Sequence, residues 1–265
     1  MRREKILLAI ITFLASTQCI IAQTKTLVWS DEFDYTGHPD SQKWSYEEGL
    51  VRNEEAQFYT KGRLENAKVA EGNLIITAHK ENFLGSKYTS ASLTTEGKYD
   101  FTYGRIEVKA KVPQGIGVWP AIWTLGRNYK SKSKVPWPDC GEIDIMEFVG
   151  YNPKIILANV MTADYRPSNG KTRGSKFIME KPAFEDFHVY ALEWYPDRLD
   201  FYVDADKYFT VSKKGEGFGE WPFDLPQYLL INLAIGGALG GRQGIDDSIF
   251  PIEYRIDYVR IYDLE

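Results

Sequence analysis

Apolar and polar residues alternate along much of this 265-residue chain, the pattern of β-strands that bury one face. In segment 104–112, alternate residues from Ile106 to Val112 are apolar, and the positions between them are charged. Segments 73–79 and 199–204 alternate in the same way, and turns containing Pro or Gly separate such segments. Long amphipathic helical patterns are absent. The pattern therefore predicts an all-β fold, a β-sandwich or jelly roll of two antiparallel sheets.

One apolar segment, residues 141–148, carries three carboxylates within six positions. Glu142 and Asp144 are two apart, so they share one face of a strand. Glu147 falls on the opposite face by strict alternation, but one extra residue around Ile145-Met146, a β-bulge, returns it to the first face. Two carboxylates at close range are what glycoside hydrolysis requires. A solvated strand edge and a cation site remain as alternatives.

The segment 142–147 (EIDIME) resembles the active-site signature of glycoside hydrolase family 16, in the bulged form found in laminarinases and other β-1,3-glucanases. The resemblance extends over roughly residues 27–263. Further blocks resemble the family in the same order: 29–34 (WSDEFD), 53–59 (NEEAQFY), 103–107 (YGRIE), 119–123 (WPAIW), 188–194 (HVYALEW), 232–237 (NLAIGG) and 256–262 (IDYVRIY).

The resemblance implies a concanavalin A-like jelly roll with a concave substrate groove. It implies a retaining endo-glycosidase that hydrolyses β-1,3-linked, laminarin-like glucans by double displacement, without a cofactor for catalysis. Glu142 is then the nucleophile and Glu147 the general acid/base, about 5–5.5 Å apart. Asp144 shares a proton or a hydrogen bond with Glu142. We expect the neighbouring negative charge to raise the pKa of Glu147.

Two tryptophans, Trp119 and Trp123, share one face of a predicted strand. Indole rings pack well on the C–H faces of sugars, but large aromatic side chains also fill cores, and both interpretations stay open. The family match favours the groove. Trp137 is a further candidate at its entrance.

Polar substrate-binding candidates also follow from the resemblance. Arg105 and Asn53 match positions that hydrogen-bond sugar hydroxyls, whereas a salt bridge and a turn are the structural alternatives. Asn232 and Gln57 are candidates of the same type. His188 either orients the carboxylates or is a structural histidine.

Family members often hold one structural calcium ion away from the groove. By match, Asp257 and Glu32 contribute carboxylate oxygens and Gly72 a main-chain carbonyl, the oxygen ligands that calcium prefers. Solvated acids are the alternative.

The chain departs from many laminarinases where Val160-Met161-Thr162 replaces Val-His-Thr. Action on mixed-linkage β-glucan, or on a galactan such as agar or porphyran, therefore stays open. Lichenases specific for mixed linkages usually lack the bulge residue, so Met146 counts against them. A non-catalytic glucan-binding protein is a third alternative, but the three retained acids argue against it.

The formal net charge of −5 argues against nucleic acid or an anionic membrane as the main partner. We expect a polysaccharide or oligosaccharide partner and a monomer. Neither a repeat nor a linker divides residues 23–265, which predicts a single catalytic domain.

Residues 1–22 have a basic start, an apolar run and then small residues, which predicts a signal peptide and a secreted or periplasmic protein without membrane insertion after cleavage. An outer-surface lipoprotein anchored through Cys19 is the alternative, but Ser16-Thr17-Gln18 is a poor lipobox. Without Cys19 the chain keeps only Cys140, which excludes an internal disulfide. We interpret Cys140 as a packing residue.

Overall fold

The computed structural model describes residues 24–129, 135–215 and 217–265. The predicted signal peptide and Cys19 lie outside these ranges. Strands dominate, and the helical segments are short: α1 (Gly237–Gly240) and three 3₁₀ turns, Arg127–Tyr129, Pro167–Asn169 and Asp247–Ile249. Within the described ranges, no helix is both long enough and apolar enough to span a membrane.

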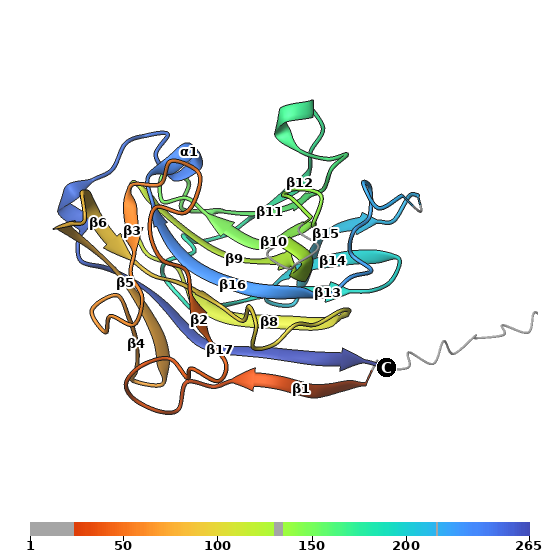
Figure 1. The fold of residues 1–265 in the computed structure, drawn as a ribbon, viewed down its shortest axis with the longest axis horizontal. Helices are drawn as coiled ribbons and strands as arrows, with labels where there is room; N and C mark the ends of the chain where they lie inside the picture. The colour runs from red at the N-terminus through yellow and green to blue at the C-terminus, as the bar shows by residue number, and fades with distance from the viewer. Residues whose placement is uncertain (1–23, 130–134, 216) are drawn as a thin grey trace, which may run out of the picture.

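Two sheets pack face to face in a sandwich (Figure 1). The larger sheet contains ten strands: β1 (Lys25–Asp31), β3 (Gln57–Tyr59), β4 (Ala67–Ala70), β5 (Asn73–Phe83), β6 (Ser86–Ser90), β8 (Gly104–Lys111), β13 (His188–Trp194), β14 (Arg198–Val203), β15 (Asp206–Ser212) and β17 (Ile252–Leu264). Their order is β15-β14-β13-β8-β17-β5-β6-β3, and β1 pairs with β17 while β4 pairs with β5.

The smaller sheet contains seven strands: β2 (Ser45–Tyr46), β7 (Ser92–Thr94), β9 (Val118–Gly126), β10 (Glu142–Phe148), β11 (Ile155–Met161), β12 (Arg173–Ile178) and β16 (Gln227–Ile235). Their order is β12-β11-β10-β9-β16-β7-β2, so the acidic strand β10 lies between β9 and β11. The predicted antiparallel sandwich is confirmed, with one exception. Strand β3 at the edge of the larger sheet pairs in parallel with β6.

The core fills the space between the sheets with alternate residues of both. Ile106 and Val108 of β8 are fully buried there, as are Ile143 of β10 and Ile231 of β16. Cys140 is buried and unbridged in a small apolar cluster, as expected of a packing residue. Because one set of alternate residues on the smaller sheet enters the core, the other set faces away from it, where the site forms.

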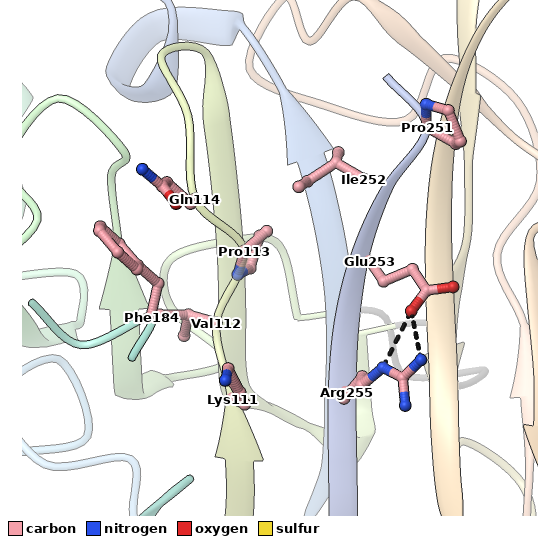
Figure 2. A pocket seen from close by; sticks show the side chains of 9 residues that line it. All are labelled: Lys111, Val112, Pro113, Gln114, Phe184, Pro251, Ile252, Glu253 and Arg255. Carbon is pink, nitrogen blue, oxygen red and sulfur yellow. Dashed lines mark hydrogen bonds and ion pairs between the residues drawn. The ribbon is translucent and has the colours of Figure 1, made fainter. Parts of the chain in front are cut away.

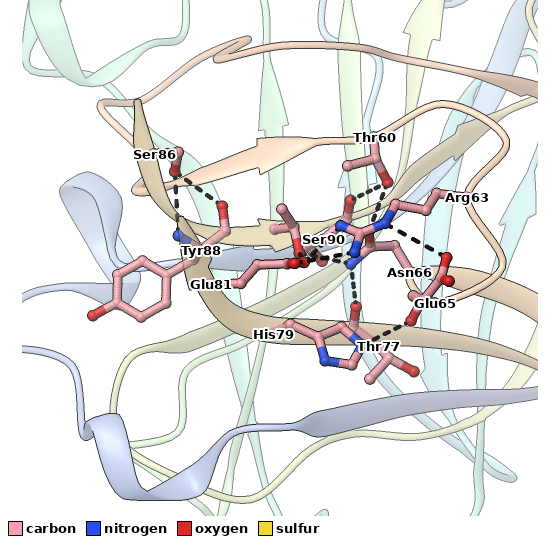
Figure 3. A network of polar contacts seen from close by, with 11 residues as sticks. Thr60, Arg63, Glu65, Asn66, Thr77, His79, Glu81, Ser86, Tyr88 and Ser90 are labelled. Atoms are coloured by element: carbon pink, nitrogen blue, oxygen red, sulfur yellow. Dashed lines mark hydrogen bonds and ion pairs between the residues drawn. The ribbon is translucent and has the colours of Figure 1, made fainter. Parts of the chain in front are cut away.

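A buried polar network holds the loop that follows β3 (Figure 3). Asn66 is fully buried; its Oδ1 accepts a hydrogen bond from Thr60 Oγ1 at 2.8 Å. Its Nδ2 donates to Thr77 O and to Thr89 Oγ1, both at 3.0 Å. These bonds attach the loop to β5 and β6. They thereby fix β3, whose Gln57 and Tyr59 hydrogen-bond to Glu55 of the site described next.

Candidate active site

Strand β10 contains the predicted bulge. Its register against β9 shifts between Asp144 and Met146, so Ile145 is an extra residue, and its register against β11 shifts between Asp144 and Glu147. Ile145 and Met146 are both buried in the core. Glu147 therefore returns to the face of Glu142 and Asp144, and the three acids line one cavity.

This cavity has a volume of about 620 Å³ and crosses strands β16, β9, β10 and β11 of the smaller sheet. We call one side the polar end, formed by Glu47, Arg52, Asn53, Glu55 and Asn232. We call the other side the apolar end, formed by Leu157, Met161 and Pro167. The acids of β10 lie between them in the sheet order, since β16 is on one side of β10 and β11 on the other.

Glu147 accepts two hydrogen bonds, one on each carboxylate oxygen. Trp119 Nε1 donates to Oε1 at 3.0 Å, and Asn159 Nδ2 donates to Oε2 at 2.7 Å. Burial raises the pKa of Glu147, and the two hydrogen bonds lower it without cancelling that effect. The predicted direction is therefore found, but burial rather than neighbouring charge is the main cause. A raised pKa suits a group that must donate a proton near neutral pH.

Glu142 and Asp144 form a linked pair. Burial and then the charge of Glu147 raise the pKa of Glu142 to about 7, while Trp137 Nε1 donates to its Oε2 at 2.9 Å. Burial, followed by the charges of Glu142 and Glu147, raises the pKa of Asp144 well above its usual value. The predicted hydrogen bond between Glu142 and Asp144 lowers the pKa of Glu142 and raises that of Asp144. When the pair holds one proton, these directions favour the proton on Asp144 and the charge on Glu142.

The tryptophans on β9 have two roles. Trp119 and Trp123 line the cavity, as predicted. Trp123 is only 6% exposed, belongs to an apolar cluster, and donates from Nε1 to Asn232 Oδ1 at 2.8 Å. It is thus both a packing residue and part of the cavity wall. Trp137 is 47% exposed and also lines the cavity.

Asn53 and Asn232 lie where the resemblance placed them, at the polar end. Asn53 is also a turn residue with φ +56°, so the turn interpretation holds, and its contact with a sugar stays a prediction. Gln57, in contrast, is fully buried behind the cavity. Its Nε2 donates to Glu55 Oε2 at 2.7 Å, and its Oε1 accepts from Ile235 N at 2.6 Å.

The structure adds site residues that the sequence did not indicate. Asn232 Nδ2 donates to the Tyr59 hydroxyl, which donates to Glu55 Oε2, each at 2.9 Å. Asn159 lies opposite Asp144 on β11. The neighbouring residue Gly174 leaves room for the Asn159 side chain. A Cβ on residue 174 would lie only 2.1 Å from Asn159 Oδ1. Besides Tyr59, Glu55 and Asn159, Arg52 is a further addition.

The predictions for Arg105 and His188 are wrong. Both residues lie on the larger sheet and outside the cavity. Arg105 forms ion pairs with Glu107 and with Glu193, the latter at 3.0 Å. His188 Nδ1 lies 2.8 Å from Asp204 Oδ2. The salt-bridge and structural-histidine alternatives are therefore correct.

The expected calcium ligands do not form a ligand set. Asp257 pairs with Lys109 at 2.6 Å and Glu32 with Arg260 at 2.8 Å, so a cation already occupies each carboxylate. Gly72 lies in the turn between β4 and β5. In the part of the chain that the structure describes, no cluster of three or more His, Cys, Asp or Glu residues is arranged for a metal ion. Calcium binding stays a prediction without support from this geometry.

Comparisons with known proteins agree with this geometry. The family model "Glycosyl hydrolases family 16" matches residues 54–260. A β-glucanase from Rhodothermus marinus is 44% identical over 272 residues, covering 99% of this chain and 94% of the relative. The solved laminarinase from Rhodothermus marinus has a TM-score of 0.87 at 44% identity and covers 92% of this chain and 99% of its own. The solved laminarinase from Flavobacterium sp. UMI-01 has a TM-score of 0.81 at 40% identity, covering 90% and 100%. With its bulged acidic strand and its two-sheet fold, the chain belongs to glycoside hydrolase family 16.

Proposed function

We propose that the chain is a retaining endo-β-1,3-glucanase that hydrolyses laminarin-like glucans by double displacement. One observation carries the proposal: the bulge in β10 brings Glu142 and Glu147 to one cavity with different hydrogen-bond partners. The similarity to laminarinases supports the substrate class.

In the first step, the Glu142 carboxylate attacks the anomeric carbon while Glu147 transfers its proton to the departing glycosidic oxygen. The bond from carbon to Glu142 forms, and the glycosidic bond breaks. The hydrogen bond from Asp144 and the one from Trp137 both stabilise the Glu142 carboxylate before attack. Burial favours the protonated form of Glu147.

In the second step, Glu147 acts as a base. Esterification has removed the negative charge of Glu142, so an ionised Glu147 no longer faces a second carboxylate. The donors Trp119 and Asn159 stabilise that ionised form. Glu147 takes a proton from water, the water oxygen bonds to the anomeric carbon, and Glu142 leaves as a carboxylate.

The two ends of the cavity suit different contacts with the glucan. The polar end offers amide and guanidinium donors for sugar hydroxyls. Met161 lines the apolar end, where the departure from the laminarinase pattern replaces a polar contact with an apolar surface. We propose that sugar recognition is stricter at the polar end.

The predicted leader also supports a place of action. We propose that the enzyme is secreted or periplasmic, where polysaccharides are encountered, and that it acts as a monomer. A lipid anchor through Cys19 is the alternative for its attachment.

A product-profile assay on laminarin, lichenan, agarose and porphyran tests the substrate class. We expect laminari-oligosaccharides from laminarin at the highest rate. Fragmentation of agarose or porphyran alone would assign the enzyme to galactans. Binding of laminarin without cleavage would favour the non-catalytic glucan-binding protein.

A further inference from the structure

Arg52 lies between β2 and β3 and lines the same cavity as Glu142. We propose that Arg52 is a substrate-binding residue that holds the sugar unit at the polar end through hydrogen bonds from its guanidinium group. The proposal rests on the function proposed above and adds a residue and a contact to it.

The position of Arg52 is fixed before any sugar binds. Its Nη2 forms an ion pair with Glu47 Oε2, and the same oxygen accepts a hydrogen bond from Ser92 Oγ at 2.7 Å. The guanidinium carbon lies 4.8 Å from the centroid of the Trp123 ring. A planar guanidinium that is held by an ion pair and stacked on an indole is pre-organised, so less freedom is lost when a ligand binds.

Arg52 still has donors to offer. A guanidinium carries five N–H groups, and the ion pair uses only one edge. Within the described structure, Nη1 has no hydrogen-bond partner although it is buried, and the side chain as a whole is 20% exposed. The exposed part of the side chain lines the cavity, where a bound sugar supplies acceptor oxygens.

Arg52 also limits how a sugar can contact the ring of Trp123. The indole is 6% exposed and has the guanidinium over its ring. A sugar at this end therefore meets the stacked pair of Arg52 and Trp123 rather than a bare aromatic face. Hydrogen bonds to hydroxyls, which depend on sugar configuration, then dominate over stacking. The charge of Arg52 also lowers the pKa of Glu142, which agrees with its place beside the nucleophile.

The test compares Arg52→Met and Arg52→Lys with Arg255→Met. Arg255 is a matched control because it is an ion-paired arginine on the larger sheet, bonded to Glu253 and Glu71. Kinetics use laminari-oligosaccharides, and binding is measured by calorimetry in the Glu142→Ser background. We expect Arg52→Met to raise KM and Kd at least tenfold with a smaller change in kcat. Arg52→Lys should show an intermediate rise, and Arg255→Met should stay within twofold of the parent.

Unchanged KM and Kd in Arg52→Met would overturn the proposal. If Arg52→Met does not fold, Arg52→Lys decides, because it keeps a cation beside Glu47: a rise in KM at an unchanged melting temperature supports the proposal, and an unchanged KM overturns it. Activity of the parent enzyme on laminarin tests the proposed function separately. If the parent cleaves only galactans, the same variants are compared on galacto-oligosaccharides.

Discussion

The acids of β10 and the acids around Arg105 are both packed within sheets, yet their surroundings are opposite. Glu107 and Glu193 share the guanidinium of Arg105 on the larger sheet. Glu142 and Glu147 have tryptophan and asparagine donors instead, and none of the ion pairs found among the described residues includes them. Neutral donors orient a carboxylate without fixing its charge. The bonding partner of an acid packed within a sheet therefore distinguishes a structural role from a reactive one.

A second hollow in the described part of the structure shows the same contrast. The second pocket, of about 460 Å³, lies on the larger sheet between the ends of β8 and β17 (Figure 2). Its one acid, Glu253, is bound by Arg255 at 2.7 Å, and Lys111 donates to Glu185 O at 2.8 Å. This smaller hollow thus offers no carboxylate free of an ion pair, whereas the cavity on the smaller sheet holds the three acids of β10, none of them in an ion pair found among the described residues.

Replacing Glu142 should have the largest effect on the reactive acids of β10, measured as loss of hydrolysis. Glu142→Ser should reduce hydrolysis of laminarin on the order of 10⁴-fold while leaving binding intact, since the covalent intermediate can no longer form. Turnover and calorimetric binding measure the two properties. Turnover near that of the parent would remove Glu142 from the nucleophile role.

Replacing Glu147 has the next largest effect. Glu147→Ala should lower kcat on glucans about 10²–10⁴-fold, because the leaving oxygen loses its proton donor. On an aryl glycoside with a good leaving group, azide should restore the rate by attacking the glycosyl intermediate. A rate that does not respond to azide would argue against the acid/base role.

Replacing Arg105 tests the structural role of its ion pairs on the larger sheet. Arg105→Met leaves Glu107 and Glu193 without their shared cation and should cost roughly 2 kcal/mol of stability, less than for a fully buried pair because both acids are partly exposed. Denaturant unfolding measures this loss. Unchanged stability together with a raised KM would return Arg105 to the substrate-binding residues.

Replacing Asn159 should have the smallest effect on activity, and it tests how the pKa of Glu147 is set. The Asn159 hydrogen bond lowers the pKa of Glu147, so Asn159→Leu should raise it further. Since the first step requires protonated Glu147, the alkaline limb of kcat/KM should move to higher pH. A limb that stays in place or moves to lower pH would contradict this assignment.

Sequence reasoning predicted the features that depend on one strand alone. The alternation in segment 104–112 predicted the core face of β8, and the spacing of Glu142 and Glu147 predicted the bulge. It failed for Arg105 and His188, which were chosen from family blocks and not from the alternation. The alternation could not correct that choice, because it shows which residues share a face but not which sheet, or which side of it, that face belongs to. The family blocks gave their order along the chain, which does not settle that question either.

The sequence did not predict which side chains on different strands contact one another. Asn159 meets Glu147 through the register of β10 and β11, and Glu55 reaches Asn232 only through Tyr59. Such partners depend on strand order and loop packing. Likewise, burial as the main cause of the raised pKa of Glu147 required the folded cavity.

The central claim is that the bulge makes Glu142 and Glu147 the nucleophile and the acid/base of a double displacement. Proton NMR of freshly cleaved laminari-oligosaccharides tests this most directly, because it detects the anomer released before mutarotation. We expect the β-anomer to appear first. Initial release of the α-anomer would show single displacement and contradict it.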